Sequence, residues 1–142
     1  MIDAVVARLK AEVPDLGNRV EESAFLADLL NKGRMPQGAT AIVFPARLQD
    51  GKSETATGYY HQEFAETLGI LLVADVNDQT GKRALDRIRP LIFEVIAALA
   101  GWAPGDELGV FNFARGTLAS MNKGRLVYQI DMTITDQLRI AT

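Results

Sequence analysis

The sequence predicts an α+β fold in which one long amphipathic helix packs on a face of an antiparallel β-sheet. Apolar residues recur at offsets of three and four from Leu85 to Leu99, which is typical of a helix with one buried side. Two strand-rich segments flank this helix, and each is divided by a turn-like stretch, as in a β-hairpin. Because the apolar side of the helix must be buried, we expect it to cover the sheet that the hairpins form. An additional N-terminal helix and a long β-hairpin arm complete the prediction.

Length and composition predict a single domain spanning residues 1–142. Hydrophobic residues make up 48% of the chain and charged residues 23%, which is ordinary for a folded domain. No repeat, low-complexity segment or long linker divides the sequence. No apolar run approaches the roughly 20 residues that span a bilayer, and the first residues lack a signal-peptide pattern, so we expect a cytoplasmic protein without a membrane contact.

The N-terminal segment predicts a helix, then a short edge strand. The helix is indicated by apolar residues at helical spacing, and Pro14 sets its end. These apolar residues are Ile2, Val5, Val6, Leu9 and Val13. Residues 18–22 could form the edge strand. Ser23 could then cap a second, short helix, whose buried side would comprise Phe25, Leu26, Leu29 and Leu30.

The first hairpin is predicted from residues 40–76. A strand at residues 40–48 contains Pro45, which indicates an edge position or a bulge. Residues 49–58 are polar and contain glycine, so we expect a solvent-exposed loop at the tip of a long hairpin. The strand at residues 59–76 alternates at first and is then continuously apolar. This change indicates one strand in two environments, with one end in the core and the other projecting into solvent or onto a partner.

The second hairpin follows the long helix. Residues 77–81 have the composition of a loop with capping residues, Pro90 should kink the helix, and Gly101 is placed to end it. Strands are predicted at residues 108–121 and 125–138, with a turn at residues 122–124. The last strand alternates cleanly, which predicts one buried and one exposed face.

Chemical motifs are sparse. The chain has no cysteine, which excludes disulfides and thiolate metal sites, and its one histidine is His61. His61 could act as a general base oriented by Glu63 or Glu66, but an ordinary strand residue explains it better, since no nucleophile motif accompanies it. The segment Gly51-Lys52-Ser53 lacks the first glycine of a phosphate-binding loop, because position 46 is alanine. We therefore predict no catalytic residue, no metal and no cofactor.

Surface residues give the candidate sites. The net charge of −3 is spread along the chain, so there is no electrostatic footprint of nucleic-acid binding. Arg83, Arg87 and Arg89 lie on the polar side of the long helix, either simply solvated or facing an acidic partner. Tyr59 and Tyr60 beside the polar loop suit a protein interface, although an ordinary hairpin tip is an equal interpretation. The predicted interface residues are Asp50, Lys52, Glu54, Tyr59, Tyr60, Arg83 and Arg87.

Nearly the whole chain resembles one family. Four segments carry the resemblance through their order and spacing: residues 1–10 (MIDAVVARLK), residues 62–73 (QEFAETLGILLV), residues 84–102 with their ALD, PLI and AALAGW stretches, and residues 125–131 (RLVYQID). These segments are similar to the tail terminator proteins of long-tailed bacteriophages.

The resemblance implies a structural virion protein rather than an enzyme. Such a protein would form a homo-hexameric ring at the head-proximal end of the tail tube, end tube polymerisation, and present a surface for head joining. The implied partners are further copies of the chain, the tail tube protein and a head–tail connector protein, while DNA passes through the ring lumen without specific binding. Assembly would take place in the cytoplasm of a bacterial host, from a phage or a prophage.

Two alternatives remain open at this point. The chain could be a different connector or a tail tube subunit, which would polymerise into long tubes. It could instead be a small ligand-binding or hydrolytic α+β domain, which predicts an apolar pocket with converging polar groups around His61.

Overall fold

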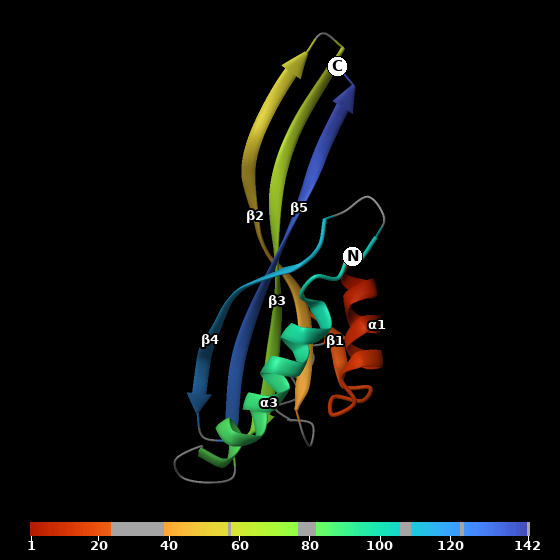
Figure 1. Cartoon of the computed structure of the whole chain (residues 1–142). Helices are drawn as coiled ribbons and strands as arrows, with labels where there is room; N and C mark the ends of the chain where they lie inside the picture. Colours follow the sequence, from red (N-terminus) through yellow and green to blue (C-terminus); the bar gives the residue numbers. More distant parts are fainter. Residues whose placement is uncertain (24–38, 57, 77–81, 106–108, 123, 142) are drawn as a thin grey trace.

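The computed structural model describes residues 1–23, 39–56, 58–76, 82–105, 109–122 and 124–141. The helices pack against one face of a single twisted sheet, so the predicted α+β class is confirmed (Figure 1). The described elements are α1 (Ile2–Glu12), β1 (Val20–Glu22), β2 (Thr40–Ala56), β3 (Tyr59–Asp75), α3 (Lys82–Leu99), β4 (Asn112–Asn122) and β5 (Arg125–Ala141). The short helix predicted after Ser23 and the loop predicted at residues 77–81 lie outside the described residues.

The sheet has the strand order β1-β2-β3-β5-β4. The two predicted hairpins, β2–β3 and β4–β5, are both present and antiparallel, and β3 also pairs antiparallel with β5. The short edge strand β1 was also predicted, but it runs parallel to β2, with Val20 opposite Ala41. The sheet is therefore mixed at one edge. The sequence did not predict this direction, because a strand of three residues carries no signal for it.

The first hairpin is longer than predicted. Strands β2 and β3 each have 17 residues and stay paired to the tip, where Ala56 lies opposite Tyr59. Residues 49–56 are thus strand, and the prediction of a loop there was wrong. Pairing to β3 satisfies their backbone groups, so polar residues that favour loops are held extended. The predicted irregularity at Pro45 is confirmed by a register shift between Pro45 and Arg47.

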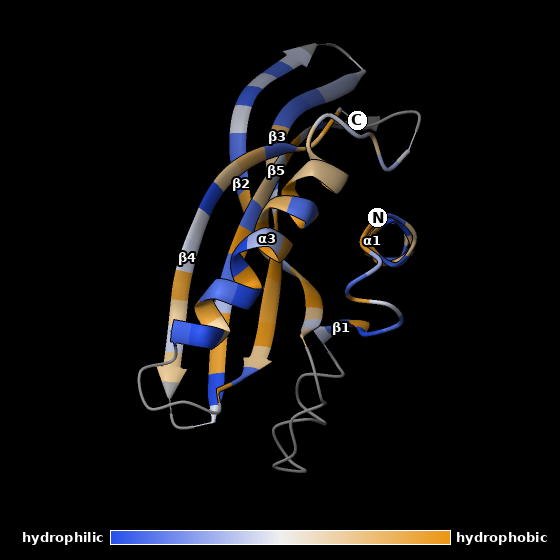
Figure 2. Cartoon of the chain, turned by 60° about the horizontal axis from the view of Figure 1, so that its bottom comes forward, coloured by the Kyte–Doolittle hydropathy of each residue, from blue (hydrophilic) through white to orange (hydrophobic). Residues whose placement is uncertain are grey.

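Three strands continue beyond the helices as an arm (Figure 1). We define the arm as residues 49–56 of β2, 59–65 of β3 and 135–141 of β5, which lie opposite one another in the sheet. Along β3 the hydropathy changes from hydrophilic in the arm to hydrophobic beneath α3 (Figure 2). The predicted strand in two environments is therefore confirmed.

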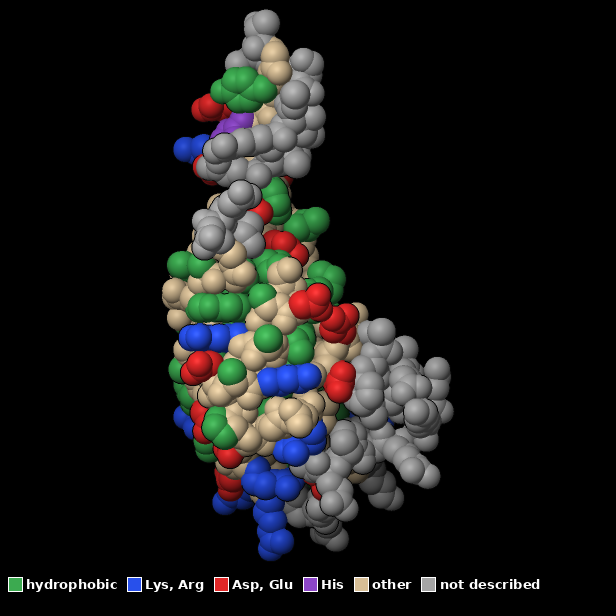
Figure 3. Space-filling view, turned by 90° about the vertical axis from the view of Figure 1, so that its right-hand side faces the viewer, with side chains coloured by type: hydrophobic (Ala, Val, Ile, Leu, Met, Phe, Trp, Pro, Cys, Tyr) green, Lys and Arg blue, Asp and Glu red, His purple; other side chains and the backbone are tan. Residues whose placement is uncertain are grey.

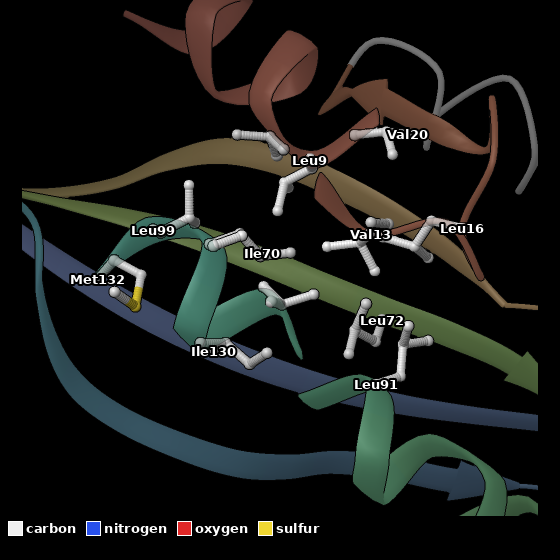
Figure 4. Close-up of a cluster of buried hydrophobic side chains, with 14 of the residues drawn as sticks. Leu9, Val13, Leu16, Val20, Ile70, Leu72, Leu91, Leu99, Ile130 and Met132 are labelled. Atoms are coloured by element: carbon white, nitrogen blue, oxygen red, sulfur yellow. The ribbon is translucent and has the colours of Figure 1, made fainter. Parts of the chain in front are cut away.

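The core lies between the helices and the part of the sheet outside the arm, and Figure 4 shows some of its side chains. Even-numbered residues of β3 and β5 point to the helices, as the alternation in β5 predicted. They meet the apolar sides of α1 and α3, and burial of each large side chain contributes about 1.5–3 kcal/mol. Fully or almost fully buried members include Val5, Leu9, Leu68, Ile70, Leu72, Ile88, Val95, Leu99, Leu126, Ile130 and Met132.

Helix α3 ends as predicted. It continues through Pro90 and stops at Leu99, after which Gly101 has a φ of +79°, a conformation that favours glycine. The Trp102 amide donates to the carbonyl of Leu99 at 3.0 Å and the Gly101 amide donates to that of Phe111 at 2.8 Å. These bonds connect the helix end to β4, which begins at Asn112 rather than near residue 108.

Candidate assembly surfaces

The arm carries five of the seven predicted interface residues. Asp50, Lys52 and Glu54 are exposed on β2, and Tyr59 is 48% exposed at the start of β3. Tyr60 is half-buried instead, and its hydroxyl donates to Oε1 of Gln62 at 2.7 Å. Since successive strand residues point to opposite faces, the two tyrosines lie on different faces of the arm.

Arg83 and Arg87 lie at the other end of the molecule, near the start of α3. Both are exposed, and lysine and arginine side chains gather at this end (Figure 3). Nη2 of Arg87 donates to the Asp75 carbonyl at 3.0 Å and lies 3.7 Å from Oδ1 of that residue. The seven predicted residues thus form two separate surfaces in one chain.

Arg89 does not belong with Arg83 and Arg87. Two residues along a helix correspond to a turn of about 200°, so Arg89 points away from Arg87. Its guanidinium lies over the ring of Phe93, with 5.6 Å between Cζ and the ring centroid. The prediction that the three arginines lie near one another on the polar side was therefore wrong for Arg89.

His61 lies in the arm, half-buried, opposite Glu54 of β2. Its Nε2 is buried and has no hydrogen-bond partner among the described residues. Glu66 points to the other face, because it differs in parity from His61. Two surface hollows are described, and neither is lined by His61. The geometry therefore offers no base oriented by Glu66, and neither hollow provides the pocket that the hydrolytic alternative requires.

The base of the arm carries an acidic, partly apolar patch on the helix side of the sheet. Leu48 is 70% exposed and lies directly across from Glu66, while Asp50 and Asp136 both lie opposite Phe64. Partial burial raises the pKa of Glu66; the Met1 amino group opposes this rise and Asp136 adds to it. The sequence gives no signal for an exposed Leu48, because this residue falls at the end of an ordinary predicted strand.

An exposed apolar strip lies on β4. Phe113, Leu118 and Met121 are 48%, 43% and 40% exposed. Their partners on β5 are Met132, Tyr128 and Leu126, which pack in or against the core, so the strip lies on the helix side beside α3 without being covered by it. The sequence did contain a signal for it, since β4 has a single charged residue, Arg115, in 11 positions.

The opposite face of the sheet holds a polar hollow of about 390 Å³. At its floor Asp131 is 6% exposed and accepts a 2.8 Å hydrogen bond from Nε2 of Gln129. Nη2 of Arg115 lies 3.4 Å from the other carboxylate oxygen. The lining residues are Ala46, Arg47, Gln49, Thr67, Ala114, Arg115, Gln129, Asp131 and Thr133. The alternation of β5 predicted Asp131 on this face, but no sequence pattern connects it to Arg115.

Among the described residues, no group of three or more histidine, aspartate or glutamate side chains is placed to hold a metal ion. None of the helices within the described ranges is long and apolar enough to cross a bilayer. The candidate sites described above are the arm, its acidic base, the apolar strip and the basic end of α3.

A family model described as phage tail terminator protein matches residues 2–142. No curated protein matches the chain. The matched range includes the arm, the apolar strip and α3.

Proposed function

The chain belongs to the phage tail terminator family, a family of structural virion proteins, and we propose that it caps the head-proximal end of the tail tube as a ring. In this role the ring ends tube polymerisation and provides the surface that joins the head. Membership makes the chain a tail component of the virion. The ring, its position and its partners are our proposal.

The observation that supports a ring is the separation of two unlike surfaces in one chain. The arm with Asp50, Glu54 and Tyr59 lies at one end, and Arg83 and Arg87 lie at the other. A contact between two different surfaces of identical copies repeats around an axis, and it closes into a ring when the rotation allows. We propose six copies, with DNA passing through the lumen without specific binding.

Under this proposal the shapes of the two ring faces end the growth of the tail tube. One face of the ring contacts the last ring of the tail tube protein, and the opposite face fits a head–tail connector protein rather than another tube ring. Under this proposal the protein works through surfaces and needs no cofactor. Assembly takes place in the bacterial cytoplasm.

The direct test is solution mass by light scattering, followed by negative-stain imaging with and without purified tail tubes. A ring of six copies in solution, or one that forms on tube ends, supports the proposal. Long tubes formed by the protein alone would favour the tail tube alternative. A monomer or dimer that ignores tube ends would contradict a terminator role.

The arm can be tested by shortening it. Asp50 and Phe64 are paired, so replacing residues 51–63 with Asn-Gly should close a shorter hairpin. We expect this variant to fold but to lose ring formation or docking to tubes. The control is Thr57→Asn, which creates the same Asn-Gly turn at the tip of a full-length arm. Normal tail length with the shortened arm would show that the arm is dispensable.

A further inference from the structure

The outer edge of β4 is suited to pairing with another strand. β4 is the last strand of the sheet, so its outer backbone groups have no strand partner among the described residues. Edge strands are usually protected by several charges, prolines or bulges. β4 has two register shifts, between Phe113 and Arg115 and between Leu118 and Ser120, but a single charge and no proline. Its segment from Arg115 to Leu118 is regular.

The apolar strip on β4 gives a second, independent indication of a partner. Phe113, Leu118 and Met121 account for three of the exposed large hydrophobic residues. The neighbouring side of α3 continues this surface, since residues with spacings of four, three and four lie on one side of a helix. This side comprises Leu85, Arg89, Ile92 and Ile96, of which the three apolar residues are partly buried against the core. The surface is thus apolar with Arg89 at its rim.

A complementary surface lies at the base of the arm. β1 pairs with residues 41–43 of β2, so among the described residues the outer edge of β2 beyond Val43 has no strand partner. Here Leu48 projects, 70% exposed, with Asp50 and Glu66 on the same face. An apolar residue among acids on one surface therefore matches an apolar strip beside an arginine on the other.

We propose that β4 of one copy pairs with residues 46–50 of β2 in the next copy and extends its sheet. Leu48 covers the apolar strip, and the carboxylates of Asp50 and Glu66 face Arg89. Each copy offers both surfaces, so the contact is heterologous and can close a ring. This inference rests on the proposed ring and names the contact that builds it.

Two disabling variants test the contact. Leu118→Lys places a charge in the strip, and Leu48→Lys places one at the arm base; both positions are exposed, so each variant should fold, as circular dichroism would verify. The matched control is Ala97→Lys, since Ala97 is exposed on α3 and, two residues after the buried Val95, points away from the sheet. We expect L118K and L48K to be monomeric at concentrations at which the wild type and A97K assemble.

Mixing the two variants shows which two surfaces meet in the contact. L118K keeps an intact arm base and L48K keeps an intact strip, so an equimolar mixture should form heterodimers and stop there. Assembly of L48K alone, with no gain on mixing, would mean that the strip pairs with itself and would overturn the proposal. Rings formed by L118K would overturn it as well.

Cross-linking tests the contact even when assembly is weak. The chain has no cysteine, so Leu118→Cys and Leu48→Cys introduce single reactive thiols. We expect a short bis-maleimide to join L118C to L48C at millimolar protein concentration, whereas the control A97C should not be joined to either variant. Absence of the L118C–L48C product overturns the contact. If that product forms but the wild type ignores tail tubes, the contact stands and the capping function fails.

Discussion

The carbonyl oxygen of Glu63 lies so close to Gly51 that a β-carbon at position 51 would be 2.9 Å from it. Gly51 lies in the register shift between Asp50 and Ser53, and the obstructing atom belongs to the backbone, which cannot rotate away. Gly51→Ala should therefore destabilise the arm by about 1–3 kcal/mol. Hydrogen exchange should show faster exchange of amides in the arm, with core amides unchanged.

The control for this prediction is Ser53→Ala, which lies at the same bulge and is exposed. It should leave exchange in the arm close to that of the wild type. Equal protection of arm amides in G51A and S53A would show that the bulge tolerates a side chain.

Asp131 depends on Arg115 and Gln129 for its hydrogen bonds. Arg115→Met leaves a nearly buried carboxylate with one of these two partners and should cost about 1–3 kcal/mol in the free energy of unfolding. Arg115→Met combined with Asp131→Asn should cost less than the sum of the single changes, because the charge that needs Arg115 is gone. Chemical denaturation of the four proteins measures this coupling, and strict additivity would contradict it.

Glu66 makes stability depend on pH. Its raised pKa means that the folded state holds the proton more tightly than the unfolded chain, whose value is near 4.5. Its favourable contribution is fully present below that pH and is lost as the pH rises through the folded-state pKa. Glu66→Gln should therefore be more stable than the wild type at pH 7, by less than about 1 kcal/mol because solvent screens the group.

The advantage of Glu66→Gln should shrink as the pH falls toward 4.5. Thermal melts of both proteins between pH 4.5 and 7 measure this difference. A gap that widens on acidification would reverse the predicted direction of the pKa shift.

Arg8 connects α1 to the end of α3. Its Nε donates to the Ala98 carbonyl at 3.0 Å, and its Cζ lies 5.3 Å from the ring centroid of Trp102. Arg8→Met should cost about 2 kcal/mol, because one hydrogen bond and one cation–π contact are lost. Arg8→Lys should not restore the full stability, since lysine lacks the planar guanidinium. The exposed Lys10→Met is the control, and an equal loss there would contradict a specific role for Arg8.

Only part of the candidate site could be predicted from the sequence. The polar stretch before Tyr59 indicated an exposed, projecting element, and the arm is one. The strip of Phe113, Leu118 and Met121 has no periodic signal in the sequence, because the two register shifts in β4 change which of its residues share a face. Which strands the long helix covers depends on packing, and here α3 leaves β4 uncovered.

The sequence by itself determined the α+β class, the apolar side of α3, the two antiparallel hairpins and the family resemblance. Apolar periodicity and turn residues act locally along the chain, so they can be recognised without the tertiary structure. The tertiary structure alone decided that residues 49–56 are strand, that β1 runs parallel, and that Leu48 and Leu118 lie at open sheet edges. These features depend on backbone pairing between distant segments. Such pairing overrides the local preference of polar residues for loops, so it leaves no periodic signal in the sequence.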